Sequence, residues 1–208
     1  GSKYLVTADD RKILVDCGLF QGLKQLRLRN REPLPIDPRS VDAVVLTHAH
    51  IDHSGYLPLF AKNGFRGRVY CSSATSDLCG ILLPDSGHLQ EEEAEYANRR
   101  GFSKHAPALP LYTVDDAKRC LSQFAPLAFD KDVDLGGGLV LRLLRSGHIL
   151  GAAFVELKYG GLRVLFSGDI GRPHDPVMPE PTPVQQADYL VVESTYGDRR
   201  HDPADPHI

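Results

Sequence analysis

The chain contains no tryptophan, one methionine and no long apolar run among its 208 residues. A helix that crosses a bilayer needs about 18 or more consecutive apolar residues, so the sequence predicts no membrane span and no membrane partner. No two cysteines have the C-x-x-C spacing of a zinc ribbon. The sequence therefore predicts the reduced, mostly buried thiols of a cytoplasmic protein at Cys17, Cys71, Cys79 and Cys120.

Neither sign of charge dominates, because 24 lysines and arginines stand against 27 aspartates and glutamates and the formal net charge is only −3. A dedicated binder of duplex nucleic acid is usually strongly basic. A charge this close to zero neither requires nor excludes a nucleic acid partner, so function has to be inferred from local motifs. Apolar residues make up 42% of the chain, and a domain of this size buries roughly 70% of its unfolded surface without disulfides. We therefore expect a globular domain.

The pattern of apolar residues predicts a mixed α/β fold. Two short β-rich runs near the start flank a four-residue turn and indicate a hairpin. The expected strands are 3–7, 12–16, 41–46, 68–71, 139–144, 152–158, 163–167 and 189–192. The expected helices are 56–60, 73–100 and 113–124, and the expected loops are 22–38 and 173–183. This mixture of strands and helices favours an α/β sandwich in which helices cover sheets.

Two of the expected helices carry further signals. Pro84 and Gly87 lie inside 73–100 and predict a break into two pieces. Thr113, followed by two aspartates, has the features of a capped helix start.

The most informative segment directly follows the strand expected at 41–46. Its sequence is Thr47-His48-Ala49-His50-Ile51-Asp52-His53. Neutral imidazoles and carboxylates are the usual ligands of Zn²⁺. One metal cannot easily take all four ligand-type side chains from so short a segment. Two neighbouring metals can, with His48 and His50 at one and Asp52 and His53 at the other. The alternative is a surface loop that is rich in histidine by chance.

Two later segments each place a ligand-type residue on a glycine turn just past an expected strand. They are Ser146-Gly147-His148 and Ser167-Gly168-Asp169. A lone histidine at such a place is more often structural, but beside the first cluster we expect His148 to be a metal ligand. We expect Asp169 to bridge the two metals, because a bridging carboxylate holds two cations close and leaves a position for a shared hydroxide.

Asp16 ends the strand expected at 12–16. Histidines that bind a metal usually donate their other ring N–H to a carboxylate. We therefore expect Asp16 to accept a hydrogen bond from a ligand histidine, namely His48. The alternative is an aspartate that only stabilises a turn.

Together and in this order, these motifs resemble those of the metallo-β-lactamase superfamily, whose diagnostic run is H-x-H-x-D-H. Three further stretches resemble its β-CASP branch of RNA- and DNA-processing nucleases, which includes the mRNA 3′-end cleavage endonuclease. They are 16–22 (Asp-Cys-Gly-Leu-Phe-Gln-Gly), 146–151 (Ser-Gly-His-Ile-Leu-Gly) and 193–198 (Glu-Ser-Thr-Tyr-Gly-Asp). The resemblance covers nearly the whole chain.

The resemblance implies an αββα sandwich with two Zn²⁺ ions per complete active site. One ion would be held by His48, His50 and His148. Asp52 and His53 would hold the other, with Asp169 as the bridge. The implied partner is single-stranded RNA, with DNA as the alternative, and a homo-oligomer is compatible with the sequence.

The implied reaction is phosphodiester hydrolysis by a metal-activated hydroxide, with Asp52 and Asp169 among the catalytic residues. A third catalytic residue, Glu193, would lie near the leaving group. It would act there either as a general acid or by orienting a histidine. We prefer the second role, because a carboxylate near cations tends to stay ionised.

The resemblance also bears on domain organisation. In this family the last metal ligand is a histidine beyond an inserted β-CASP domain, and a further strand precedes the segment that begins here at Gly1. We therefore expect 1–208 to be the N-terminal part of a metallo-β-lactamase domain, incomplete at both ends. The insertion would begin near or after 195–208. By itself such a piece would be weakly active or inactive.

Two alternatives remain open. One is a hydrolase of a small thioester, lactone or β-lactam on the same fold, against which the stretches 16–22 and 193–198 argue. The other is a non-catalytic scaffold paralogue, which is expected to have lost ligands. This chain keeps every ligand that it is long enough to show. Activity on RNA compared with activity on a thioester would separate the hydrolases.

Overall fold

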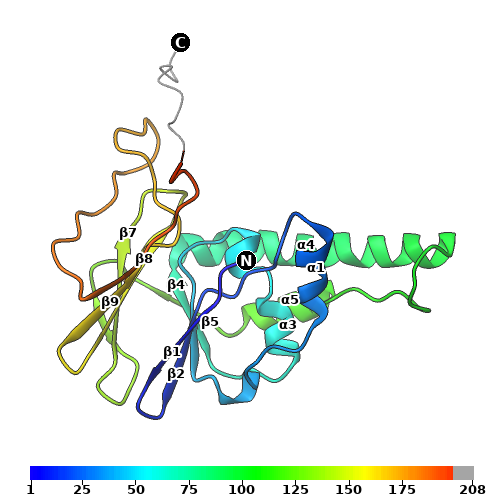
Figure 1. The fold of residues 1–208 in the computed structure, drawn as a ribbon, viewed down its shortest axis with the longest axis horizontal. Coiled ribbons are helices and arrows are strands. Elements are labelled where there is room, and N and C mark those ends of the chain that lie inside the picture. Colours follow the sequence, from blue (N-terminus) through cyan, green and yellow to red (C-terminus); the bar gives the residue numbers. More distant parts are fainter. Residues whose placement is uncertain (199–208) are drawn as a thin grey trace.

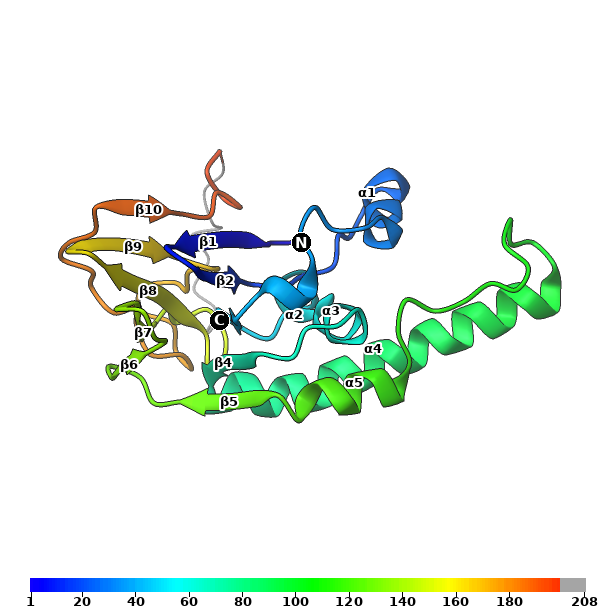
Figure 2. The same ribbon diagram turned by 90° about the horizontal axis from the view of Figure 1, so that it is seen from below.

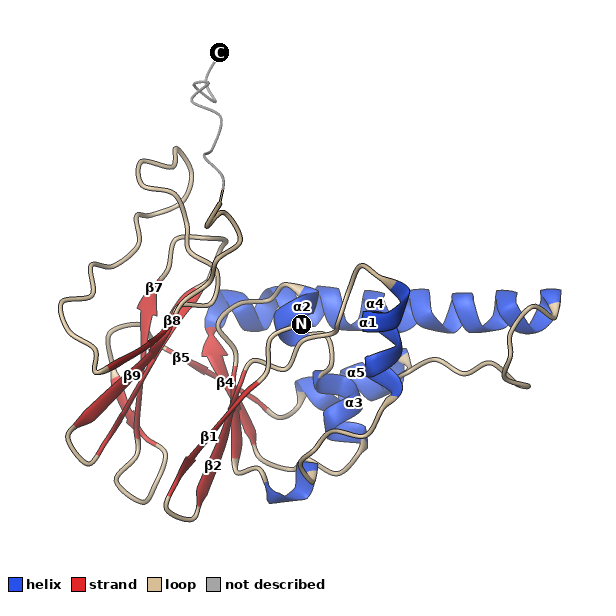
Figure 3. Cartoon of the chain, in the orientation of Figure 1, coloured by secondary structure: helices blue, strands red, loops and turns tan. Residues whose placement is uncertain are grey.

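The computed structural model describes residues 1–198 and contains two stacked five-stranded β-sheets with helices packed against the first sheet (Figures 1 and 3). The first sheet has the order β1-β2-β3-β4-β5 and the second the order β10-β9-β8-β7-β6. The expected mixed α/β sandwich is therefore confirmed. Most of the segment in which the inserted domain was expected to begin, 199–208, lies outside the described residues.

The strands of the two sheets are close to those expected from the sequence. The first sheet comprises β1 (Tyr4–Ala8), β2 (Arg11–Val15), β3 (Ala43–Val45), β4 (Arg68–Ser72) and β5 (Phe124–Leu127). The second comprises β6 (Asp132–Asp134), β7 (Val140–Arg145), β8 (Ala153–Tyr159), β9 (Leu162–Phe166) and β10 (Tyr189–Val191). The sequence did not predict β5 and β6, which are short and contain no buried residue.

Successive side chains along each strand point to opposite faces of the sheet, and this divides the core into two parts. In β2, Ile13 and Val15 face the second sheet and join the cluster between the sheets, whereas Leu14 joins the cluster under the helices. All three residues of β3 are buried, as expected for a parallel strand covered on both faces. Sheet β1–β5 is therefore the middle layer, and its two faces fix the positions of the helices and of the second sheet.

The helices lie on the outer face of the first sheet (Figure 2). They are α1 (Lys24–Leu28), α2 (Ile51–Ser54), α3 (Leu57–Lys62), α4 (Ser73–Arg100) and α5 (Val114–Leu121), with 3-10 turns at Arg29–Arg31 and Pro38–Ser40. No helix in 1–198 covers the outer face of the second sheet, so three of the four expected layers are present there. Ion pairs such as Arg142–Asp132 and Lys158–Glu156 lie on that sheet.

Helix α4 corrects the expectation of two shorter helices. It continues through Pro84 and Gly87 to Arg100, and Gly101 ends it in the left-handed conformation with φ +67°. A Cβ on Gly87 would lie 2.9 Å from the carbonyl carbon of Thr113, so this glycine lets α4 approach the start of α5. Tertiary packing therefore keeps the helix intact where local propensity predicted a break. The C-terminal half of α4 projects beyond the sheets (Figure 2).

The segment 22–38 also differs from the expected loop, because it contains α1 and a 3-10 turn. The buried Asn30 explains this order: its amide side chain accepts from the Phe20 N–H and donates to the Phe20 carbonyl, each at 2.8 Å. The start of α5 is as expected, because Thr113 and Asp116 form a reciprocal capping box. Within the described part of the chain, no helix has the length and apolar character needed to cross a membrane.

Candidate metal centre

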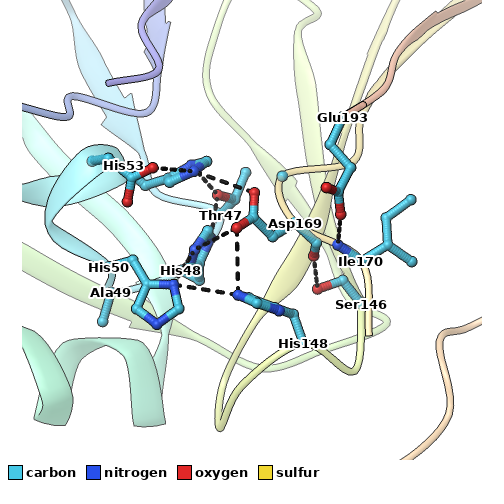
Figure 4. Close-up of polar contacts among 12 residues, drawn as sticks. Thr47, His48, Ala49, His50, His53, Ser146, His148, Asp169, Ile170 and Glu193 are labelled. Carbon is cyan, nitrogen blue, oxygen red and sulfur yellow. Dashed lines mark hydrogen bonds and ion pairs between the residues drawn. The ribbon is translucent and has the colours of Figure 1, made fainter. Parts of the chain in front are cut away.

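The expected site residues follow five strands that end at one edge of the sandwich. Strands β2 and β3 are parallel, β7 and β9 are each antiparallel to β8, and β10 is parallel to β9. The residues that follow these strands are Asp16, His48, His148, Asp169 and Glu193. Segments far apart in the sequence thus bring ligand-type side chains to one place (Figure 4).

Four side chains form the first cluster of donor atoms. His50 Nδ1 lies 3.1 Å from His48 Nε2 and 3.3 Å from His148 Nε2. Asp169 Oδ2 lies 3.4 Å from His148 Nε2 and 3.7 Å from His48 Nε2. Ligand atoms bound tetrahedrally to zinc at 2.0–2.2 Å stand roughly 3.3–3.6 Å from one another. The spacing and chemistry of these donors therefore fit one Zn²⁺ ion.

The second cluster lies on the other side of Asp169. His53 Nε2 is 3.3 Å from Asp169 Oδ1 and 3.6 Å from Asp52 Oδ2. Asp169 thus turns one carboxylate oxygen toward each cluster (Figure 4). The described residues supply three donors to this cluster, and the Asp52 side chain is 46% exposed.

Asp16 lies against His53, which corrects the expectation that it would pair with His48. Its Oδ2 is 2.8 Å from His53 Nδ1, and its Oδ1 accepts from the Thr47 backbone N–H at 2.8 Å. The Thr47 hydroxyl donates to Asp16 Oδ2 at 2.9 Å and lies 3.0 Å from His48 Nδ1. Because this hydroxyl occupies the position beside His48, the carboxylate reaches the other histidine.

Thr47 is therefore the residue that sequence reasoning overlooked. Its hydroxyl contacts Asp16, His48 and His53 at the same time. Asp16 itself has a left-handed backbone with φ +59°, a conformation that is uncommon outside glycine and often marks a functional site. The sequence signal was the position of Thr47 between the end of β3 and the first histidine.

Burial and neighbouring charges set the protonation of the metal-free centre. Burial, and then the charge of His53, lower the pKa of His48 to about 2. Burial also lowers the pKa of His53, but hydrogen bonds with Asp16 and Asp169, together with the charges of Asp16 and Asp52, outweigh it and raise that pKa to about 10. The hydrogen bond with His53 lowers the pKa of Asp169 to about 2. A metal at the second cluster therefore has to displace a proton from His53.

Hydroxyl groups hold the loops that carry His148 and Asp169. The carbonyl of Gly151 accepts from Ser72 Oγ at 2.6 Å and from Thr75 Oγ1 at 3.0 Å. The Ser146 hydroxyl donates to the Asp169 carbonyl at 3.0 Å. These contacts fix the His148 loop to the start of α4 and to the Asp169 turn, and nothing in the sequence around Ser72 indicated that role.

Two motif glycines allow the close approach of these segments. A Cβ on Gly18 would lie 1.6 Å from the Asp52 carbonyl oxygen. Gly168 has φ +51°, and a Cβ there would lie 2.6 Å from Thr47 Cβ. Any larger side chain at either place would push the donor-bearing segments apart.

Glu193 lines the cleft on both sides of Asp169. Beside His148 the cavity has a volume of about 420 Å³, and beside Asp52 and His53 it has about 430 Å³. Glu193 Oε1 accepts from the Ile170 N–H at 2.5 Å, and the Glu193 N–H donates to Ser167 Oγ at 3.0 Å. The structure thus brings this carboxylate to the cleft, as its place at a strand end indicated.

Comparisons with known proteins agree with this geometry. Residues 1–205 match the metallo-beta-lactamase superfamily. The ribonuclease TTHA0252 of Thermus thermophilus is 37% identical over 203 residues, which are 98% of this chain and 42% of that protein. The transcription termination factor FttA of Methanocaldococcus jannaschii is 32% identical, covering 93% of this chain and 29% of that protein.

A eukaryotic relative shows the same partial coverage. Subunit 3 of the cleavage and polyadenylation specificity factor of Dictyostelium discoideum is 28% identical over 97% of this chain and 25% of that protein. The chain thus spans less than half the length of each of these three relatives. The matches confirm the resemblance found in the sequence motifs. With two stacked sheets, a histidine and aspartate cluster at their shared edge and a match over residues 1–205, this chain belongs to the metallo-β-lactamase superfamily.

Proposed function

We propose that this chain carries the dinuclear zinc centre of a β-CASP nuclease that hydrolyses phosphodiester bonds in single-stranded RNA. The observation that carries the proposal is Asp169, whose two carboxylate oxygens face two separate clusters of donors. A carboxylate between two donor clusters is suited to hold two cations at once. The names of the relatives, among them a ribonuclease and a cleavage factor, support RNA as the substrate.

In this proposal His48, His50 and His148 hold one zinc ion, and Asp52 and His53 hold the other. Bound there, zinc supplies Lewis acidity that acidifies water and offsets the negative charge of a phosphate. Three imidazole nitrogens with one carboxylate oxygen form a donor set that binds zinc in preference to harder cations.

The other residues of the centre orient the metal ligands and set their protonation. Asp16 fixes the ring of His53 through the 2.8 Å contact with Nδ1, so that Nε2 faces the cleft. Burial of His48 keeps its imidazole neutral and able to bind a metal. Glu193 is held by the Ile170 N–H in the cleft wall, where its carboxylate is placed to orient a group near the leaving oxygen.

Because the relatives are longer than this chain, we further propose that 1–208 acts as the metal-binding part of a longer nuclease. A further histidine ligand and the inserted domain would come from outside this segment. RNA is the substrate that we propose, with DNA as the alternative.

Substitution of the bridging residue tests the proposal. Asp169→Asn keeps the shape of the side chain but removes its charge, so we expect zinc content to fall from both clusters. In the longer protein that contains 1–208, hydrolysis of a small phosphodiester, bis(p-nitrophenyl) phosphate, should fall by more than about 100-fold, because both cations contribute to catalysis. Zinc is measured by elemental analysis of the purified chain, and Asp175→Asn, a change in the same cleft wall outside the donor clusters, is the control.

Substrate assays then choose between hydrolases on this fold. We expect the zinc-loaded longer protein that contains 1–208 to cleave labelled single-stranded RNA and to leave a thioester intact. Full zinc content and unchanged hydrolysis in Asp169→Asn would contradict the dinuclear centre. Thioester hydrolysis without phosphodiester cleavage would contradict the nuclease.

A further inference from the structure

A groove with a volume of about 860 Å³ lies between the segment 19–31 and the projecting half of α4. The loop that follows α4, residues 102–111, completes its wall. The walls expose large apolar side chains, including Leu28, Leu89 and Phe102. The proposed catalytic chemistry makes no use of this groove.

The charged side chains of the groove favour an anionic occupant. Lys24, Arg27 and Arg31 line it, and the lining carboxylate is Glu93. This local excess of positive charge contrasts with the net charge of −3 of the whole chain. Lys24 and Arg27 are exposed and form no ion pair with the other residues of 1–198, so they are available to bind phosphate groups.

Two aromatic rings, Tyr96 and Phe102, also line the groove. Tyr96 is 47% exposed and Phe102 is 64% exposed, and their ring centroids are 5.8 Å apart. Arg99 and Arg100 lie over the Tyr96 ring at 5.9 and 5.6 Å. Exposed rings interleaved with cations are typical of surfaces that bind single-stranded nucleic acid, because bases stack on the rings while the cations follow the phosphates.

The chain segment 17–20 links one wall of the groove to the candidate metal centre through backbone hydrogen bonds. The Cys17 N–H donates to the His53 carbonyl at 2.7 Å, and the Leu19 N–H donates to the Ile51 carbonyl at 2.9 Å. Phe20 follows directly, lines the groove and is fixed by Asn30. One wall of the groove is therefore anchored to the turn that carries the metal donors.

We propose that this groove binds the stretch of single-stranded RNA that flanks the cleavage site. The proposal rests on the proposed nuclease function and adds a binding surface outside the metal centre. Cations bind the phosphates and release counterions, which makes the binding dependent on salt. Tyr96 and Phe102 supply stacking surfaces that accept any base.

Charge reversal in the groove provides the first test. The zinc-loaded chain is titrated with a fluorescent phosphorothioate oligouridylate, which resists hydrolysis, and binding is followed by anisotropy at several salt concentrations. Lys24→Glu/Arg27→Glu should weaken binding at least tenfold. It should also reduce the slope of log affinity against log salt by about 1.4, because each phosphate contact to a single strand contributes about 0.7.

The matched control reverses two cations elsewhere. Arg68 and Lys131 are exposed and line none of the described cavities. Arg68→Glu/Lys131→Glu makes the same change in net charge, and we expect it to alter affinity less than threefold. A second variant, Tyr96→Ala/Phe102→Ala, should weaken binding about tenfold or more and leave the salt slope unchanged, since stacking carries no charge.

Hydrolysis of bis(p-nitrophenyl) phosphate keeps this inference separate from the proposed function, because that substrate is too small to occupy the groove. In the longer protein that contains 1–208, groove variants should hydrolyse it as the parent protein does. The inference is overturned if the parent chain does not bind the oligonucleotide, or if the groove and control variants lose affinity equally. It is also overturned if the groove variants bind RNA normally but change the sedimentation of the chain, which would assign the groove to a second copy.

Discussion

The two donor clusters on either side of Asp169 are built differently. The first draws its side chains from three strand ends and places four donor atoms within 4.8 Å of one another. The second takes Asp52 and His53 from a single turn and adds one oxygen of Asp169. His48 of the first cluster is fully buried and neutral, whereas His53 of the second is held protonated by Asp16 and Asp169.

This difference predicts an order of metal binding. The first cluster already offers the four donors of a tetrahedral zinc site, and the lowered pKa of His48 means that this ring holds no proton that zinc must displace. The second offers three donors and must release the proton of His53. We therefore expect the first cluster to bind zinc more tightly, and the second to need a further ligand or water.

The largest effect is expected from the first cluster. His48→Ala removes a buried donor, so zinc affinity there should fall by more than the roughly 100-fold typical of losing an outer contact. His88 lies on α4 with a 60% exposed side chain, and His88→Ala is the matched control with unchanged affinity. Competition with a chromophoric chelator measures both. Tight zinc binding by His48→Ala at the parent stoichiometry would show that the clusters are not ordered in this way.

An intermediate effect is expected from the residue behind the second cluster. Asp16→Asn removes the charge that orients His53, while asparagine tolerates the left-handed backbone at this position. Zinc affinity of the second cluster should fall about 10–100-fold.

The first cluster should lose little affinity in Asp16→Asn, because Asp16 contacts His53 and not His48. Two-site fits of a zinc titration separate the clusters. An equal loss of zinc affinity at both clusters would mean that Thr47 transmits the change to His48. Unchanged zinc affinity at both clusters would mean that Asp16 only stabilises the turn.

The smallest effect is expected from the loop that carries His148. Ser72 caps α4 by accepting from the Thr75 N–H at 3.2 Å and donates to the Gly151 carbonyl at 2.6 Å. Ser72→Ala should lower the free energy of unfolding by about 1–2 kcal/mol and weaken zinc at the first cluster severalfold. Denaturant unfolding and zinc titration measure the two effects, with Ser122→Ala, which removes a hydroxyl at the end of α5, as the control. A loss of zinc affinity confined to the second cluster would contradict the role assigned to Ser72.

Much of this arrangement could be predicted from short sequence patterns. The hairpin β1–β2 and the strands β7, β8 and β9 appeared within a residue or two of their positions, because alternation and turn residues are local signals. The donor residues were recognisable from their types and their positions after strands. Strands β5 and β6 were missed because they are short and mostly unburied, and α4 was misread because packing against α5 outweighs the breaks that Pro84 and Gly87 suggest.

The sequence by itself determined which residues could bind metal and that they follow strand ends. It could not determine which carboxylate pairs with which imidazole, because that depends on where side chains from separate strands point. Only the tertiary structure placed the Thr47 hydroxyl beside His48, and thereby directed Asp16 to His53. Only it brought 19–31 against α4 to form a groove. Residue types fix which side chains can bind a metal, whereas the packing of the core decides which distant segments come into contact.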